Sequence, residues 1–291
     1  MTDADLVRRL VAGQFPQWAG LPLREAPDAG SDHVIFRLGD DMAVRLPRDW
    51  AAHQAAKDER WLPLLAPRLP LPVPVPLAVG EPAFGFPHRW SVVRWLAGRV
   101  ATVDGFADPA GTAVELAEFL RALRGLPAPR DLAPGSYDDL STWSLADRDA
   151  STRAAIAKVE GVFDTAALTR VWDEALAAPA WDGPPVWFHG DFHLGNLLTV
   201  DGRLSAVIDF GGLGTGDPAC DLMVGWTALS PRTRRVFREA LGVDDATWAR
   251  GLGWGMATGL GAYVSYAATR PSVARATTYQ VTQVLADRTG A

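Results

Sequence analysis

The chain has 291 residues, of which 48% are apolar and 21% charged, and this balance excludes a protein that is disordered throughout. A formal net charge of −6 and the lack of a run of Lys and Arg argue against nucleic acid as a partner. Cys220 is the only cysteine, which excludes an intrachain disulfide and a four-cysteine zinc site. We expect neither a signal peptide nor a membrane span, and therefore a cytoplasmic protein with no membrane partner.

The first third of the chain is rich in predicted strands. Apolar residues at helical or alternating spacing, together with Gly and Pro, set the expected bounds. In chain order we expect a helix over 3–18, strands over 33–38 and 42–46 joined by a turn at 39–41, a helix over 50–61 that ends before Pro63, an extended proline-rich connector over 67–78 and a strand over 91–96.

The rest of the chain is predominantly helical in prediction. Its one strand-rich stretch, 186–210, contains a hairpin around Asp201-Gly202, a two-residue turn of the favoured type. We expect a helix over 116–126, a loop over 127–150, helices over 151–160 and 165–178, and after Pro218 helices to the end with breaks near Pro231, Gly242 and Pro271.

The segment FHGDFHLGNLL, 188–198, gathers several polar side chains. His189, Asp191 and His193 alternate, so on a strand they would share one face as the metal ligands of a hydrolase. Metallophosphatases have a similar D-x-H pattern, but their later ligands are missing here, because Asp217 and Asp221 have the wrong spacing and no histidine follows residue 193. A metal-dependent hydrolase that uses His189, Asp191 and His193 is thus an alternative and not the main interpretation.

Asp191, Asn196 and Asp209 support a second interpretation, phosphoryl transfer from a nucleotide. Such a reaction needs one carboxylate that orients the attacking hydroxyl and accepts its proton, and an amide oxygen and a second carboxylate that hold Mg²⁺ across the phosphates. The predicted hairpin brings its two ends together, so that Asn196 and Asp209 can flank one ion.

Three motifs, in the same order along the chain, resemble segments of one phosphotransferase family. HGDFHLGN, 189–196, resembles the catalytic loop of the aminoglycoside phosphotransferase (APH) family, VIDF, 207–210, resembles its magnesium-binding segment, and GDPACDL, 216–222, resembles its G-D-P-x-x-D-L segment. The resemblance runs from about residue 25 to 230 and implies an α+β, bilobal protein-kinase-like fold. It implies a small β-rich N-lobe over 1–94, a hinge over 95–98 and a larger, mainly α-helical C-lobe over 99–291.

The resemblance also implies a nucleotide site in the N-lobe. MAVR, 42–45, matches the kinase strand V-A-I-K, with Arg45 where protein kinases have a lysine. Alternation puts Ala43 and Arg45 on the face toward the nucleotide, and the guanidinium fork of Arg45 would contact phosphates. Glu59, on the following helix, is the expected partner that positions Arg45.

Two further segments complete the expected nucleotide site. Ser31 and His33 lie in GSDH, 30–33, where a glycine-rich loop would cover the phosphates. The segment from Arg94 to Leu96 would be the hinge whose backbone binds the adenine or guanine edge.

The resemblance assigns roles to the polar residues of the C-lobe. Asp191 would be the catalytic base, Asn196 and Asp209 would hold Mg²⁺, and ATP or GTP would be the phosphate donor. His189 is expected to support the loop, and His193 could be a loop histidine or a phosphate contact. Asp217 and Asp221 are expected to fix the loop by accepting hydrogen bonds from backbone N–H groups.

The acceptor is a small-molecule hydroxyl, for which the family's namesake suggests an aminoglycoside-type antibiotic. A macrolide or a small metabolite alcohol is the alternative acceptor, and a nucleotide-binding pseudokinase is the alternative without catalysis. Either an acidic pocket or an apolar, tryptophan-lined one could bind the acceptor. The candidate residues are Asp138, Asp139, Asp173, Glu174, Asp244 and Asp245 for the first pocket and Trp143, Trp226 and Trp254 for the second.

Overall fold

The structure is a computed structural model that describes residues 3–26, 32–129 and 144–289. The chain forms two compact units. The first unit contains Met1–Gly98, and the later segment Ser205–Gly211 returns to it. The second unit is built from most of the remaining chain.

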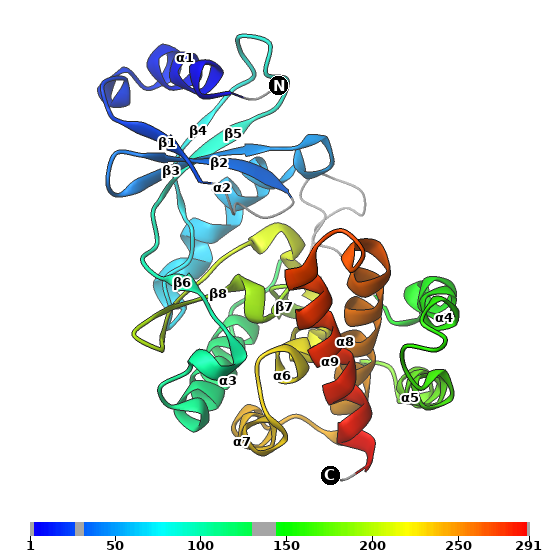
Figure 1. Cartoon of the computed structure of the whole chain (residues 1–291). Coiled ribbons are helices and arrows are strands. Elements are labelled where there is room, and N and C mark those ends of the chain that lie inside the picture. The colour runs from blue at the N-terminus through cyan, green and yellow to red at the C-terminus, as the bar shows by residue number, and fades with distance from the viewer. Residues whose placement is uncertain (1–2, 27–31, 130–143, 290–291) are drawn as a thin grey trace. The chain divides into compact units, whose positions relative to one another are not determined.

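A five-stranded antiparallel sheet forms the first unit (Figure 1). Its order is β1-β2-β3-β5-β4, which keeps the predicted hairpin of β2 and β3 in the middle. The turn between these strands contains Gly39, whose φ of 62° suits glycine. The bounds are β1 Leu23–Glu25, β2 His33–Leu38, β3 Met42–Pro47, β4 Pro76–Gly80 and β5 Trp90–Arg94.

One face of this sheet packs against α1, Ala4–Gln14, in a core of buried apolar residues. Met42, Val44 and Leu46 of β3 all point into this core. Because side chains alternate along a strand, Ala43 and Arg45 face the opposite side of the sheet, as the alternation predicted.

Two elements of the first unit differ from the sequence prediction. Helix α2 covers Gln54–Leu65 and contains Pro63, whereas the prediction ended the helix before this proline. Buried Trp61, Leu62 and Leu65 hold its last turn in place, which offsets the hydrogen bond that proline removes. Strand β4 begins at Pro76, inside the predicted connector, and proline is accepted there because it is the first residue of an edge strand.

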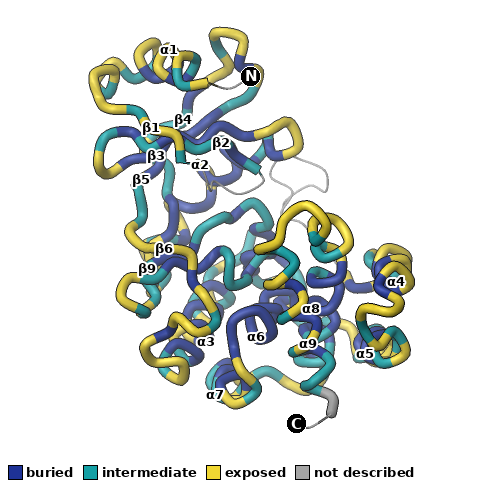
Figure 2. Tube along the Cα trace, in the orientation of Figure 1, coloured by how far each residue is buried: buried dark blue, intermediate teal, exposed yellow. Residues whose placement is uncertain are grey.

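The second unit is mainly helical, and its buried residues lie at its centre (Figure 2). Small sheets pair β7 with β10 and join β6, β8 and β9. Its helices are α3 Pro109–Arg124, α4 Asp149–Lys158, α5 Thr165–Ala177, α6 Val224–Thr227, α7 Pro231–Leu241, α8 Asp245–Tyr266 and α9 Pro271–Thr289, and its strands are β6 Arg99–Val100, β7 Val186–Phe188, β8 Leu197–Val200 and β10 Gly214–Gly216. Strand β9, Arg203–Val207, begins in the second unit, and its last three residues belong to the first.

Helix ends in the second unit follow local sequence signals. Ser230 caps α7 through Thr233 N–H, and Gly242 ends the same helix in a left-handed conformation. Trp226 and Trp254, two of the candidates for an apolar substrate pocket, are fully buried core residues instead. Within the described residues, no helix has the length and apolar character that a membrane span requires.

Candidate active site

The polar loop 189–196 follows directly on β7, whose Trp187 and Phe188 are buried. Gly190 has a φ of 84°, and a Cβ atom there would lie 2.0 Å from the carbonyl oxygen of Gly212, so only glycine fits. Phe192 is buried and stacks on Phe119 of α3, with ring centroids 5.5 Å apart and ring planes 5° from parallel. These contacts fix the loop on the core of the second unit.

The carboxylate of Asp221 holds the beginning of the same loop. Its two oxygens accept hydrogen bonds from the backbone N–H groups of His189 and Gly190, each at 2.8 Å. Burial raises the pKa of Asp221 to about 6, although these two hydrogen bonds and Arg124 oppose the increase. The expected structural role of Asp221 is therefore confirmed.

Asp217 has a related role in the segment that follows. Its Oδ1 accepts a hydrogen bond from the backbone N–H of Ala219 at 3.0 Å, and its Oδ2 lies 2.7 Å from Arg250 Nε. Asp217 thus fixes local backbone, as expected, and also pairs with a buried arginine of α8.

Asp191 combines a half-exposed carboxylate with fixed neighbours. Its side chain is 49% exposed, while Asn196 Nδ2 donates to its backbone oxygen and to its Oδ2, both at 2.9 Å. His193 Nδ1 accepts from Gly195 N–H at 3.0 Å, so its Nε2 carries the proton that faces Asp191 Oδ2 at 3.3 Å. The carboxylate is therefore oriented and still open to a substrate.

The electrostatic surroundings keep Asp191 ionised. Burial alone would raise the pKa of Asp191, but the nearby His193 and His189 and the hydrogen bond from Asn196 outweigh it and lower the pKa below its ordinary value. An ionised carboxylate is the state that a proton acceptor needs.

His189 is a structural histidine, as expected. It is fully buried, and its Nδ1 accepts the backbone N–H of Asp191 at 3.3 Å. Over the described ranges, no three His, Cys, Asp or Glu side chains are grouped as they would be around a metal ion. The hydrolase alternative, which needs His189, Asp191 and His193 as a set of ligands, therefore has no support from the geometry.

Asn196 has the chemistry of a magnesium ligand. Its amide nitrogen is tied to Asp191, and no hydrogen bond within the described part of the chain engages its Oδ1. Mg²⁺ prefers oxygen ligands of this kind. Asn196 and Asp209 each supply an oxygen donor of the kind that the implied ion prefers, and their joint role as its ligands stays a prediction.

In the first unit, Arg45 forms a buried ion pair with Asp58, at 3.0 Å between Nη1 and Oδ2. His33 Nδ1 lies 3.5 Å from Arg45 Nη2 and accepts, because arginine only donates. Burial, Arg45 and His53 lower the pKa of His33 well below its ordinary value, so His33 is neutral here. Arg45 is thus held from both sides by side chains of its own unit.

The expectation that Glu59 pairs with Arg45 is wrong. Glu59 is half exposed and pairs with Arg89 at 3.1 Å. The phase of the helix explains the difference, since buried Trp61, Leu62 and Leu65 mark the inward face. Asp58 lies three residues before Trp61 and four before Leu62 and so falls within this face, whereas Glu59 is turned a further roughly 100° around the helix.

The same helical phase identifies Lys57, a buried residue that the sequence interpretation missed. Lys57 Nζ donates a hydrogen bond to the carbonyl oxygen of Gly211. Asp209, two residues before this glycine, has a left-handed φ of 64°, and its Oδ1 accepts a hydrogen bond from Gly211 N–H at 3.4 Å. Asp209 belongs to the first unit, and Asp191 and Asn196 belong to the second.

The other predicted nucleotide contacts lie at the sheet and its last strand. Ala43 is buried in β3, and Arg94 is exposed at the end of β5. The segment that leads to Leu96 is fixed by Trp95 N–H, which donates to Asp41 O at 2.7 Å. Ser31 lies outside the described residues.

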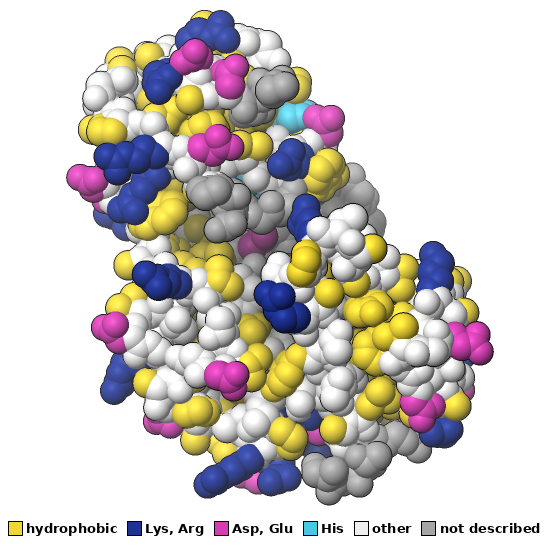
Figure 3. All heavy atoms as spheres, viewed as in Figure 1, with side chains coloured by type: hydrophobic (Ala, Val, Ile, Leu, Met, Phe, Trp, Pro, Cys, Tyr) yellow, Lys and Arg dark blue, Asp and Glu magenta, His cyan; other side chains and the backbone are white. Residues whose placement is uncertain are grey.

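The acidic side chains proposed for the acceptor do not form a pocket among the described residues. Asp173 pairs with Arg153, Asp245 pairs with Arg238, and Asp244 caps α8 through Thr247 N–H. Glu174 is exposed on α5, and Asp138, Asp139 and Trp143 lie outside the described residues. On the face of the second unit seen in Figure 3, acidic and basic side chains are interspersed.

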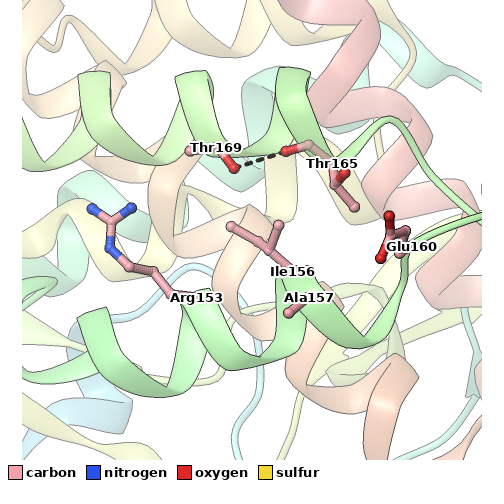
Figure 4. A pocket seen from close by; sticks show the side chains of 6 residues that line it. All are labelled: Arg153, Ile156, Ala157, Glu160, Thr165 and Thr169. Atoms are coloured by element: carbon pink, nitrogen blue, oxygen red, sulfur yellow. Dashed lines mark hydrogen bonds between the residues drawn. The ribbon is translucent and has the colours of Figure 1, made fainter.

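A hollow of about 320 Å³ lies between α4 and α5 (Figure 4). Arg153 and Glu160 are its charged lining residues, and Thr169, also in its lining, donates a hydrogen bond to Thr165 O. None of its lining residues belongs to the loop 189–196 or to the segments that we expected to bind nucleotide.

An antiparallel sheet with a buried Arg–Asp pair, followed by a helical unit with an HGDxHxxN loop, defines a protein-kinase-like fold. The chain belongs to the phosphotransferase enzyme family (APH), whose model matches residues 23–254. The resemblance seen in the three sequence motifs is thereby confirmed.

The chain is similar to parts of two curated proteins. A glucosamine kinase from Streptacidiphilus jiangxiensis is 28% identical over 202 residues, which is 67% of this chain and 43% of that protein. An aminoglycoside 3′-phosphotransferase from Escherichia coli is 26% identical over 165 residues, 54% of this chain and 59% of that protein. The chain thus spans about half the length of these relatives.

Solved structures share the fold over nearly the whole chain. The GDP complex of aminoglycoside 2′-phosphotransferase-IIIa has a TM-score of 0.73 at 18% identity and covers 99% of this chain and 100% of its own. A macrolide 2′-phosphotransferase from Brachybacterium faecium has a TM-score of 0.62 at 24% identity, with 96% and 97% covered. These likenesses confirm the predicted protein-kinase-like fold.

Proposed function

We propose that the protein is a small-molecule O-phosphotransferase that moves the γ-phosphate of ATP or GTP to a hydroxyl group. The observation that carries the proposal is Asp191, a half-exposed, ionised carboxylate held in place by Asn196 and His193. A carboxylate in this state orients the acceptor hydroxyl and takes its proton as the phosphoryl group is transferred.

The acceptor that we propose is the hydroxyl of an amino sugar, free or within an aminoglycoside-type antibiotic. This choice rests on the two curated relatives, which are named for glucosamine and for aminoglycosides. A macrolide is the second candidate, because a solved neighbour is a macrolide 2′-phosphotransferase. The donor is a cytoplasmic metabolite, and we therefore place the reaction in the cytoplasm.

In this proposal, Asn196 and Asp209 hold Mg²⁺, which neutralises phosphate charge when it is bound. Arg45 steadies the donor phosphates through its guanidinium fork, while Asp58 and His33 fix its orientation. Gly190, Phe192 and Asp221 keep the catalytic loop in one conformation. Positioning of this kind is the main contribution that a protein makes to phosphoryl transfer.

The test is nucleotide consumption in a coupled assay with amino sugars, aminoglycosides and macrolides as acceptors. We expect Asp191→Asn and Asp191→Ala to lower turnover by about 10²- to 10⁴-fold, the usual contribution of a positioned base, and to leave nucleotide binding intact. Asp201→Asn is the matched control, because Asp201 is an exposed turn residue. Unchanged turnover in both Asp191 variants would show that the assigned role is wrong.

A further inference from the structure

Helix α2 carries an unusual buried face. Gln54, Lys57 and Asp58 are spaced three and four residues apart, so they share one side of the helix, and their exposed fractions are only 4%, 2% and 1%. Burial of an ammonium group costs several kcal/mol unless anionic or hydrogen-bonding partners compensate it. A lysine at such a position therefore indicates a specific partner.

The composition of the chain makes this lysine more unusual. Only two of its 28 basic residues are lysines, Lys57 and Lys158, and all the others are arginines. A lysine offers a compact ammonium group on a flexible stem, whereas an arginine offers a wide planar fork. The one buried lysine thus lies where we expect a compact ammonium group to fit better than a planar guanidinium.

The partner of Lys57 is the turn that follows Asp209. Lys57 Nζ donates to Gly211 O, and a Cβ atom on Gly211 would lie 2.5 Å from Gln54 Nε2. Two side chains of α2 therefore lie against the same glycine. Gly211 N–H in turn donates to Asp209 Oδ1, so this contact continues to the carboxylate.

Asp209 needs such support because its backbone is left-handed. A φ of 64° is uncommon for a residue other than glycine and persists only where the surroundings fix it. Lys57 interacts electrostatically with both Asp58 and Asp209, which act against the decrease that burial causes in its pKa. With Arg45, the group contains two cations and two carboxylates, so its charges balance.

We propose that Lys57 is a positioning residue for Asp209, which holds the turn 209–211 in the conformation that presents the Asp209 carboxylate to Mg²⁺. The inference rests on the proposed function, and it goes beyond it by separating the two buried cations. Arg45 serves the donor phosphates, while Lys57 serves the magnesium ligand. Lys57 acts through Gly211 and Asp209 and contacts no substrate.

The test is Lys57→Met, which keeps most of the apolar stem and removes the charge, with Lys158→Met as the matched control on an exposed lysine. Nucleotide affinity is measured by tryptophan fluorescence in EDTA and across a Mg²⁺ titration, and urea unfolding reports on the fold. We expect Lys57→Met to bind nucleotide in EDTA as the wild type does, and to need about 10- to 100-fold more Mg²⁺ for the magnesium-dependent change, as loss of an outer-shell partner does elsewhere.

The outcomes separate this inference from the proposed function. A folded Lys57→Met with an unchanged Mg²⁺ requirement overturns the role of Lys57, and so does an equal loss of affinity in EDTA, which would mean that Lys57 shapes the nucleotide site as a whole. If Lys57→Met does not fold, Lys57→Gln is measured in the same way. A wild type that binds no nucleotide, or that ignores Mg²⁺, contradicts the proposed function instead.

Discussion

The carboxylate of Asp221 illustrates what a single buried residue contributes to this protein. Its two carboxylate oxygens accept the His189 and Gly190 N–H groups, although Asp221 lies more than thirty residues away along the chain. Aspartate suits this position because one side chain supplies two acceptor oxygens. The start of the loop 189–196 therefore depends on a residue that takes no part in the proposed chemistry.

Replacement of Asp221 by Asn leaves one oxygen for two N–H groups. We expect Asp221→Asn to lower the free energy of unfolding by about 1–3 kcal/mol at pH 7, because one backbone N–H loses its acceptor. The pKa of Asp221 is raised from 3.8 to about 6. Between these values the folded state holds more protons than the unfolded state, so the contribution of Asp221 to stability decreases as the pH rises.

The pH dependence is therefore a second signature of this variant. The stability gap between wild type and Asp221→Asn should be largest near pH 4, shrink as the pH rises to about 6, and then stay constant. Urea unfolding followed by tryptophan fluorescence between pH 4.5 and 7.5 measures it, with Asp201→Asn expected to follow the wild type. A gap that widens toward neutral pH contradicts the prediction.

The contact between Asp191 and Asn196 in the loop 189–196 could be predicted from the sequence because its signal is local, and the catalytic and metal-binding roles of the two residues stay predictions. Asp191 and Asn196 are brought together by a short loop, and a motif captures such a loop completely. The choice between Asp58 and Glu59 is different, since adjacent carboxylates look equivalent in a motif. It depends on which side of α2 faces the protein interior, and only the buried apolar residues at the end of the helix identify that side.

At the scale of elements, the prediction failed mainly at prolines. Pro63 lies inside α2, and Pro76 begins β4, although both residues were expected to prevent regular structure. Burial of neighbouring side chains and the edge position of a strand decided these cases, and neither is visible in local propensity. The β2–β3 hairpin was predicted because its turn and its alternation agree.

Two glycines with similar φ values allow the cost of a left-handed backbone to be compared with the cost of a steric overlap. Gly161 and Gly190 have φ values of 78° and 84°, but no atom lies within 4 Å of a Cβ built on Gly161, whereas a Cβ on Gly190 would overlap Gly212 O. We expect Gly161→Ala to cost about 1–2 kcal/mol, the cost of a left-handed backbone. Gly190→Ala should cost more than about 4 kcal/mol, a loss seen only with severe local disruption.

The two variants are compared by urea unfolding and by turnover. Gly190→Ala should also lose activity, because β7 and the catalytic loop meet at this residue, while Gly161→Ala should keep it. Equal losses of stability in the two variants would show that the close approach of Gly190 to Gly212 is not a constraint.

At the scale of the whole molecule, the family match ends within α8, and α9 lies beyond it. Arg234 of α7, whose side chain is almost fully buried, is one of the residues that contact α9. Its guanidinium donates to Gln283 Oε1 and Asp287 Oδ1, both at 2.6 Å, and lies over the ring of Trp226. Arg234 thus links the last helix to the part of the second unit that the family model covers, and Gln280 of α9 adds a further link by donating to Gly255 O of α8.

Binding of the donor should stabilise the whole molecule. A ligand that binds only the folded state adds about 2.7 kcal/mol at a hundredfold excess over its Kd. We expect ATP or GTP in EDTA to stabilise wild type and Asp209→Asn equally, and Mg²⁺ to add further stability only to the wild type. Thermal and urea unfolding with and without Mg²⁺ measure this, and an equal magnesium effect in both proteins would remove Asp209 from the ion site.

Cys220 has a practical consequence for such measurements. Its sulfur is buried beside Asp217 and Asp221, and burial together with these carboxylates raises the pKa of the thiol well above its ordinary value. The folded protein therefore resists alkylating reagents, while an opened chain accepts one adduct at a single place. The rate at which mass spectrometry detects this adduct therefore reports how often the structure around Cys220 opens, without an introduced dye or an engineered cysteine.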